Sequence, residues 1–140
     1  MNFLPTLREL VRAYQGFVDY AVPHIKKMGL TNSQFDVIAA LGNQPPMTCK
    51  EIGEKTLITK GTLTGILERL EAKGLIKKYL NVADERSYLT ELTKEGQRVF
   101  DKSFIEHMEY LEKAFGKLSK KELETTATLL KLLRKAFETT

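Results

Sequence analysis

The sequence predicts a mainly α-helical protein with one small β-ribbon. Apolar residues recur at spacings of three and four over residues 3–27, 31–42 and 59–73, and again from residue 93 onward. Three capping boxes, each a Thr or Ser followed three residues later by Gln or Glu, begin at Thr31, Thr48 and Ser119. Two strand-like runs, 75–80 and 87–92, flank a short polar segment and predict a hairpin.

Length and composition favour one globular domain, which we expect to span residues 1–140. The 140 residues are 42% hydrophobic and 29% charged, which is enough apolar material for a core. A net charge of +4 permits a polyanionic partner without requiring one. The single cysteine excludes an intrachain disulfide. Neither a signal-like N-terminus nor a long apolar window is present, so we expect a cytoplasmic protein that does not enter a membrane.

The first predicted helix, residues 3–27, carries an unusually wide apolar stripe. Pro5 suits its first turn, whereas Pro23 should kink or end it. Such a stripe is hard to bury in a monomer of 140 residues. We therefore expect residues 1–28 and 94–140 to form a helical region that makes a homodimer.

The segment 31–93 has the element order of a winged helix-turn-helix. Thr48 opens a short helix that ends near Lys55, and Thr59 caps the next helix after a short turn. The predicted hairpin follows directly, in the place of a wing. This order predicts a lobe that binds double-stranded DNA.

The helix that begins at Thr59 has one face free of bulky apolar groups. Hydroxyls and a lysine can reach base edges or phosphates, and Gly61 and Gly65 allow a close approach of the backbone. A solvated helix face with capping threonines would look the same, so this helix alone is ambiguous. The residues that we expect to contact DNA here and nearby are Thr48, Thr59, Lys60, Gly61, Thr62, Thr64, Gly65, Arg69, Lys78, Asp84 and Arg86.

The ribbon adds cations beside that helix: Lys73, Lys77 and Lys78 precede the hairpin loop, and Arg86 ends it. Residues 48–93 hold eight basic and seven acidic side chains. The net charge of this segment therefore says nothing about DNA binding, and only the positions of the cations do. Arg86 at a ribbon tip could reach a minor groove, with Asp84 holding its guanidinium in a bidentate pair. The alternative is an exposed ion pair that only stabilises the turn.

At this point the residues resemble a known family. The run L63-T-G-I-L-E-R-L-E-A-K-G-L-I-K-K78, then D84-E-R86 and L92-T-K-E-G96, is similar to the signature of MarR-type transcription regulators. The resemblance covers about residues 31–96. It implies a homodimer with interleaved first and last helices, a pseudo-palindromic operator, major-groove contacts from the helix near Thr59 and a minor-groove contact from Arg86.

Two residues depart from the family pattern. Gly65 stands where many members have an arginine, and Lys78 replaces a common arginine, which weakens any bidentate contact. The run K60-G-T-L-T64 is most similar to the branch that senses organic peroxides. That branch uses a reactive cysteine on its first helix, and residues 3–27 contain no cysteine.

The resemblance also implies a small organic effector, commonly an aromatic acid or a lipophilic compound. Candidate lining residues are Phe17, His24, Phe35 and Met108, although each could be an ordinary core or surface position. Redox sensing is the alternative, because Cys49 lies at a helix N-terminus beside Lys50, where a thiol can become reactive. Two scattered histidines predict no metal site, and no cofactor is expected.

The sequence is compatible with three classes of function to different degrees. A dimeric, sequence-specific regulator that acts as a repressor explains the most residues. A winged helix used only for protein interaction stays open because the net charge is modest. An enzyme is disfavoured, since no nucleophile–base pair, phosphate-binding loop or metal-ligand spacing occurs.

Overall fold

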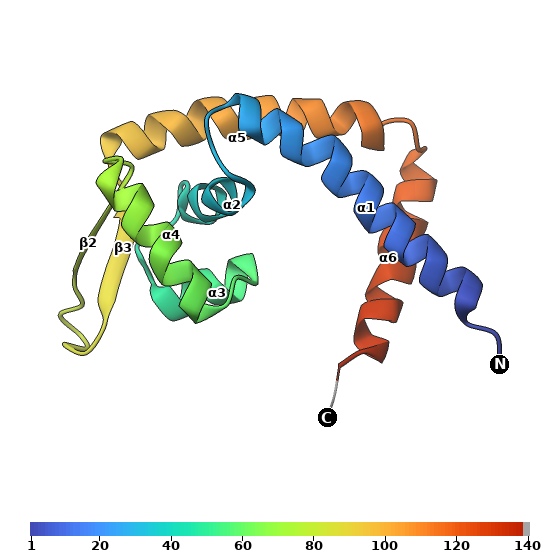
Figure 1. Cartoon of the computed structure of the whole chain (residues 1–140), viewed down its shortest axis with the longest axis horizontal. Coiled ribbons are helices and arrows are strands. Elements are labelled where there is room, and N and C mark those ends of the chain that lie inside the picture. Colours follow the sequence, from blue (N-terminus) through green and yellow to red (C-terminus); the bar gives the residue numbers. More distant parts are fainter. Residues whose placement is uncertain (139–140) are drawn as a thin grey trace. The chain divides into compact units, whose positions relative to one another are not determined.

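The computed structural model describes residues 1–138, which form six helices and three short strands (Figure 1). The order is α1 (Leu4–Lys27), α2 (Asn32–Leu41), β1 (Met47–Thr48), α3 (Cys49–Thr56), α4 (Lys60–Ala72), β2 (Ile76–Leu80), β3 (Tyr88–Leu92), α5 (Lys94–Phe115) and α6 (Lys120–Ala136). The predicted fold class, a mainly α-helical winged helix-turn-helix with a small ribbon, is confirmed. The chain divides after His107 into two compact units, which are described separately.

All three predicted capping boxes are present. The hydroxyls of Thr31, Thr48 and Ser119 each accept a hydrogen bond from the backbone N–H three residues later. Thr59 precedes α4 as expected, but its hydroxyl donates to Thr62 Oγ1 at 3.3 Å and makes no capping bond. The expectation of a side-chain cap at Thr59 was therefore wrong, and the first N–H groups of α4 are left for other acceptors.

Pro23 does not end α1, contrary to one of the expectations above. The helix continues to Lys27, with Pro23 on its exposed side. A carbonyl that loses its partner there can bond to water, which keeps the cost of the proline low. Only Ala21 and Ile25 of α1 are buried, so the helix joins the first unit by its C-terminal end.

The core of the first unit lies among α2, α3, α4 and the sheet. Its largest fully buried side chains are Ile38, Ile52, Leu63, Leu70 and Val37. Leu57, in the turn between α3 and α4, has a left-handed backbone (φ 62°) and is 87% exposed. The turn of the helix-turn-helix is short, because α4 begins only three residues after Leu57.

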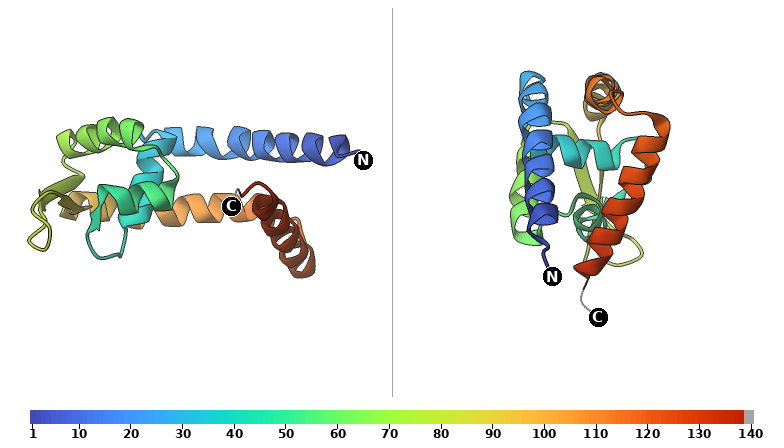
Figure 2. Two further views of the ribbon diagram at one scale, coloured as in Figure 1. Left: turned by 90° about the horizontal axis from the view of Figure 1, so that it is seen from below. Right: turned by 90° about the vertical axis from the view of Figure 1, so that its right-hand side faces the viewer.

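The sheet has three antiparallel strands in the order β1-β3-β2. Lys78 lies opposite Thr90, and Met47 lies opposite Thr90 on the other side of β3. The strand β1 was not predicted, because two residues after Pro45 and Pro46 are too few to show a period of two. It ties the start of α3 to the middle of β3, and the ribbon projects beyond the helices of the first unit (Figure 2).

The base of the ribbon is locked to the start of α5. Thr93 donates from Oγ1 to the carbonyl of Gly74 at 2.6 Å and from its backbone N–H to the carbonyl of Leu75 at 3.1 Å. A Cβ atom on Gly96 would lie 1.9 Å from the Leu75 carbonyl oxygen. Only glycine fits at position 96, and Gly74 has a φ of +76° that also favours glycine.

The second unit contains the end of α5 and the helix α6. The capping box of Ser119 and Glu122 opens α6, and these contacts lower the pKa of the Glu122 carboxyl. No residue of α6 is buried within the single chain. Among residues 1–138, no helix combines the length and the apolar character needed to cross a membrane.

Candidate nucleic-acid interface

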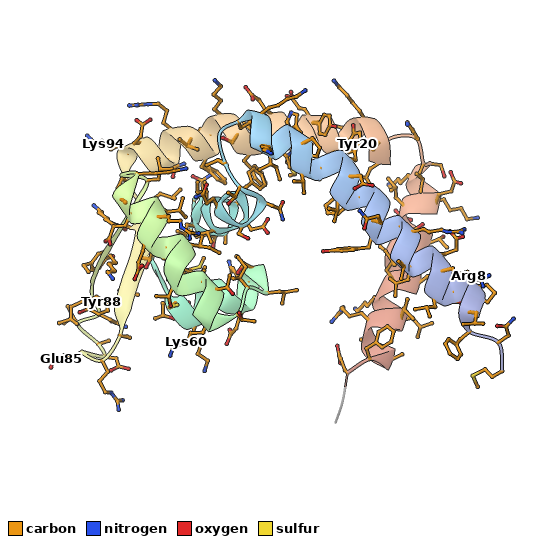
Figure 3. All side chains as sticks on the ribbon, in the orientation of Figure 1. Arg8, Tyr20, Lys60, Glu85, Tyr88 and Lys94 are labelled. Atoms are coloured by element: carbon orange, nitrogen blue, oxygen red, sulfur yellow. The ribbon has the colours of Figure 1, made fainter. Side chains whose placement is uncertain are left out.

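A groove of about 850 Å³ lies between the N-terminal part of α3, one side of α4 and the ribbon. Lys60 projects from the N-terminal end of α4, and Tyr88 and Glu85 mark the ribbon (Figure 3). One side of α4 lines the groove, because the residues on it are three or four positions apart: Lys60, Thr64, Glu68 and Glu71. The groove therefore lies between α4 and the ribbon.

Six of the expected DNA-contacting residues line this groove, and the structure brings them together from four elements: Thr48, Lys60, Thr64, Lys78, Asp84 and Arg86. The hydroxyl of Thr64 donates to the Lys60 carbonyl at 3.0 Å, and the hydroxyl of Thr48 donates to Glu51 at 3.0 Å. Both hydroxyls keep an acceptor oxygen but would have to exchange these bonds before they could donate to DNA.

The other five candidates lie outside the groove wall on the accessible surface of α4 and its first turn: Thr59, Gly61, Thr62, Gly65 and Arg69. A Cβ atom on Gly61 or Gly65 would meet nothing within 4 Å. This second surface is low and open, as a helix that enters a major groove requires. Thr62 accepts from Thr59 and so still has its own proton to donate.

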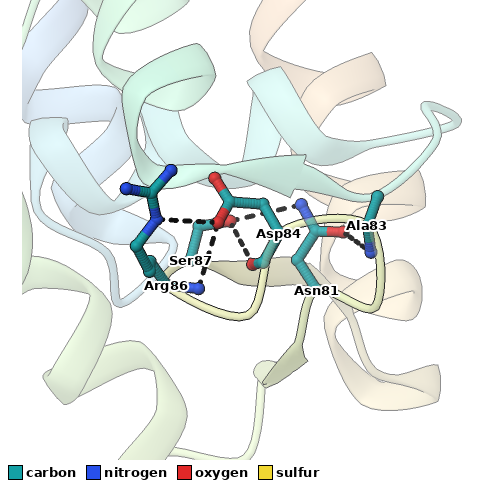
Figure 4. Close-up of polar contacts among 5 residues, drawn as sticks. All are labelled: Asn81, Ala83, Asp84, Arg86 and Ser87. Carbon is teal, nitrogen blue, oxygen red and sulfur yellow. Dashed lines mark hydrogen bonds and ion pairs between the residues drawn. The ribbon is translucent and has the colours of Figure 1, made fainter.

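The wing loop is built by two side chains that accept backbone hydrogen bonds (Figure 4). Asn81 Oδ1 accepts from the N–H of Ala83 at 3.1 Å, and Asp84 Oδ1 accepts from the N–H of Arg86 at 3.1 Å. Ser87 closes the loop by donating from its backbone N–H to the Asp84 carbonyl at 3.0 Å. These bonds define the turns of the loop at the ribbon tip.

Asp84 holds the Arg86 guanidinium by one contact, Nε to Oδ1 at 3.3 Å. The expected bidentate pair was wrong, because the same Oδ1 also accepts from the Arg86 backbone and the two residues are too close in sequence for a fork. The Arg86 side chain is 93% exposed. Most of the guanidinium therefore projects from the loop and is free to donate elsewhere.

The lysines expected to cluster with Arg86 separate in the structure. Lys73 donates to Gln34 Oε1 on α2 at 3.3 Å, and Lys77 pairs with Glu91 at 3.3 Å. Neither residue lines the groove. The charged groove residues are the cations Lys50, Lys60, Lys78 and Arg86 and the anions Glu54, Glu68, Glu71 and Asp84, so the groove is not a simple basic patch.

Tyr88, Asn81 and Ser87 also line the groove but were not among the sequence candidates. Asn81 and Ser87 lie in a polar loop whose sequence does not indicate which side chains face the groove. Tyr88 could have been found from the strand pattern, because the register puts it two residues from Thr90, the partner of Lys78. The period of two alone could not fix that register.

Two of the four effector candidates lie together in the first unit. His24 and Phe35 both contact His107: the two histidine Nδ1 atoms are 2.9 Å apart, and the Phe35 ring meets the His107 ring edge-on at 4.9 Å. The histidines are thus adjacent rather than scattered. Phe17 lies on the exposed part of α1, 45% exposed, and Met108 begins the second unit.

Cys49 is half-buried at the start of α3, where it packs against the core and lines the groove. Within the described part of the chain, no three His, Cys, Asp or Glu side chains converge in a way that could hold a metal ion. The chemistry available at the groove is hydrogen bonding and charge from exposed donors, which suits an acidic polymer with a repeating backbone.

Helix-turn-helix, ribbon and donor-lined groove together define a winged-helix DNA-binding protein. The profile of the MarR family matches residues 28–87. The regulator MhqR of Bacillus subtilis is 29% identical over 122 residues, which cover 87% of this chain and 84% of that protein. The homoprotocatechuate degradative operon repressor of Escherichia coli is 31% identical over 94 residues, which cover 67% of this chain and 64% of that protein.

A solved structure is similar over nearly the whole chain. BpsR of Bordetella bronchiseptica, whose DNA binding is regulated by 6-hydroxynicotinic acid, superposes with a TM-score of 0.78 at 29% identity. The match covers 96% of this chain and 99% of that chain. The chain belongs to the MarR family, and it is a DNA-binding transcription regulator rather than an enzyme.

Proposed function

We propose that this protein is a homodimeric repressor that binds a pseudo-palindromic operator in the cytoplasm and leaves it when a small organic effector binds. The observation that carries the proposal is the groove with Arg86 on one wall and Lys60 on the other. A DNA strand whose backbone runs along this groove would have α4 in the major groove on one side and the wing in the minor groove on the other.

Each wall has a separate task in this proposal. The open surface of α4 around Thr62 and Gly65 reads base edges, because small side chains let the helix approach them. Arg86, held at its Nε by Asp84, extends the rest of its guanidinium toward the minor groove. The two recognition helices of the dimer then lie about one helical turn of DNA apart.

Selection of bound genomic fragments followed by gel shifts tests the proposal. We expect one or a few palindromic sequences to be enriched and binding to weaken steeply with salt. Arg86→Ala should weaken binding to all sequences, whereas Thr62→Ala should also change base preference. Arg98→Ala, which removes an exposed arginine that does not line the groove, is the matched control and should bind as wild type does. Equal affinity for all sequences at physiological salt would overturn the sequence-specific regulator, and absence of DNA binding would favour a protein-interaction module.

The same operator tests the proposed release. An aromatic ligand is proposed to bind near the junction of α1, α2 and α5, where the rings of His24, Phe35 and His107 already pack against one another. Aromatic acids should dissociate the complex in wild-type protein and in Cys49→Ser alike. Loss of release by organic peroxide, and only that loss, in Cys49→Ser would favour the redox alternative.

A further inference from the structure

The two faces of the ribbon carry different chemistry. Lys78, Tyr88 and Thr90 line the groove, whereas the alternate residues Lys77, Tyr79 and Glu91 point to the opposite face. Because Lys78 lies opposite Thr90 and Tyr88 lies opposite Leu80, Lys78 and Tyr88 are diagonal neighbours on one face. Long side chains reach each other across such a diagonal.

The two adjacent lysines consequently have different partners. Lys77 Nζ is 3.3 Å from Glu91 Oε1 on the outer face. Lys78 Nζ lies over the ring of Tyr88, 5.4 Å from its centroid, on the groove face. In residues 1–138 this ring is the partner described for the Lys78 ammonium, and no carboxylate pairs with it.

A carboxylate and an aromatic ring act on an ammonium in different ways. The carboxylate cancels the charge, so Lys77 adds little field to its surroundings. The ring attracts the ammonium through its quadrupole but has no net charge, so it orders the lysine side chain and leaves the full positive charge available. Tyr88 is 54% exposed, so both groups of the pair are accessible from the groove.

We propose that Tyr88 is a positioning residue that holds the Lys78 ammonium at the groove, where it binds a phosphate of the DNA strand between α4 and the wing. This inference rests on the proposed function. Tyr88 lies on the ribbon and Lys60 on the facing end of α4 (Figure 3). Lys60 and Lys78 then contact the strand from opposite walls.

Salt titration of binding to a random-sequence duplex and to the selected operator tests the inference. Loss of one phosphate contact reduces the slope of log K against log salt concentration by about 0.9. Lys78→Gln should show this reduction on both duplexes, because a phosphate contact carries no sequence information. The matched control, Lys77→Gln on the outer face, should leave the slope unchanged.

Tyrosine variants separate the role of the ring from that of the hydroxyl. Tyr88→Leu should weaken binding about two- to fivefold, as expected for loss of an exposed cation–π contact, while Tyr88→Phe should bind as wild type does. In the Lys78→Gln background, Tyr88→Leu should have no further effect. Tyr79→Leu, which removes a ring from the outer face, should bind as wild type does, and circular dichroism should show that every variant is folded.

Several outcomes would overturn the inference. It fails if Lys78→Gln keeps the wild-type slope, if Tyr88→Phe is as weak as Tyr88→Leu, or if the two substitutions act independently. When Arg86→Ala weakens binding but these variants do not, only this inference is wrong. When the wild-type protein binds neither duplex, the proposed function fails with it.

Discussion

At the scale of single residues, a contact between two histidines joins α1 to α5 in the first unit. His107 is 2% exposed, and its Nδ1 is 2.9 Å from Nδ1 of His24, so one ring must donate while the other accepts. Burial, and to a lesser extent the charge of His24, lowers the pKa of His107 below its ordinary value of 6.5. The folded chain therefore favours the neutral imidazole.

This shift makes stability depend on pH with a defined sign. Below pH 6.5 His107 binds a proton in the unfolded chain, whereas in the folded chain it stays neutral until the pH reaches its lowered pKa. Acidification therefore favours unfolding. The contribution is complete above pH 6.5, decreases as the pH falls toward the lowered pKa and then levels off. Urea unfolding between about pH 8 and pH 5 should show a smaller loss of stability in His107→Gln than in wild type. Parallel curves for the two proteins would contradict this assignment.

At the scale of elements, two glycines differ in their surroundings: one faces open space on α4 and the other is tightly packed in α5. Gly65 lies inside α4, where a Cβ atom would meet nothing within 4 Å. Gly96 lies in the first turn of α5, where a Cβ atom would lie 1.9 Å from a backbone oxygen that cannot rotate away. The same residue type is thus dispensable for folding in one helix and required in the next.

Alanine substitutions should show this contrast at fixed protein concentration. Gly65→Ala should raise the free energy of unfolding by about 0.5–1 kcal/mol, because a helix-interior glycine is replaced without a clash. Gly96→Ala should lower it by about 3 kcal/mol or more, because the ribbon base or α5 must move. Denaturant unfolding measures both, and equal effects of the two changes would contradict the packing described here.

Most elements were predictable because their signals are local. Capping boxes at Thr31, Thr48 and Ser119 and the apolar periodicity predicted all six helix starts within about a residue, whereas the strand β1 has no local signal. The site was less predictable. Which lysine faces the groove depends on the ribbon register, and the contacts of Lys73 with Gln34 and of His24 with His107 join residues far apart in sequence.

At the scale of the whole molecule, exposed apolar side chains gather at the two ends of the chain. On α1 they are Phe3, Leu4, Leu7, Val11, Tyr14 and Phe17, and on α6 they are Leu129, Leu130 and Leu132, followed by Phe137. A soluble monomer rarely exposes so much apolar surface. These two helices are the surfaces through which we propose that the homodimer forms.

Charge placed on these surfaces should dissociate the dimer. Leu7→Glu or Leu130→Glu buries an unpaired carboxylate in the interface, so the chain should sediment as a monomer and lose most operator affinity. Arg12→Glu, on the side of α1 opposite its apolar stripe, is the control and should remain dimeric. A wild-type chain that is monomeric at micromolar concentration would contradict the proposed assembly.

The open space above Gly61 and Gly65 has a consequence for how this regulator can diverge. Because no packing contact depends on either position, new side chains there can alter the preferred operator without a compensating change in the scaffold. In the proposed mode of DNA binding, specificity and folding therefore depend on separate residues of α4. A library randomised at these two positions should yield folded proteins with different target sequences, and duplicated genes could acquire new targets by the same route.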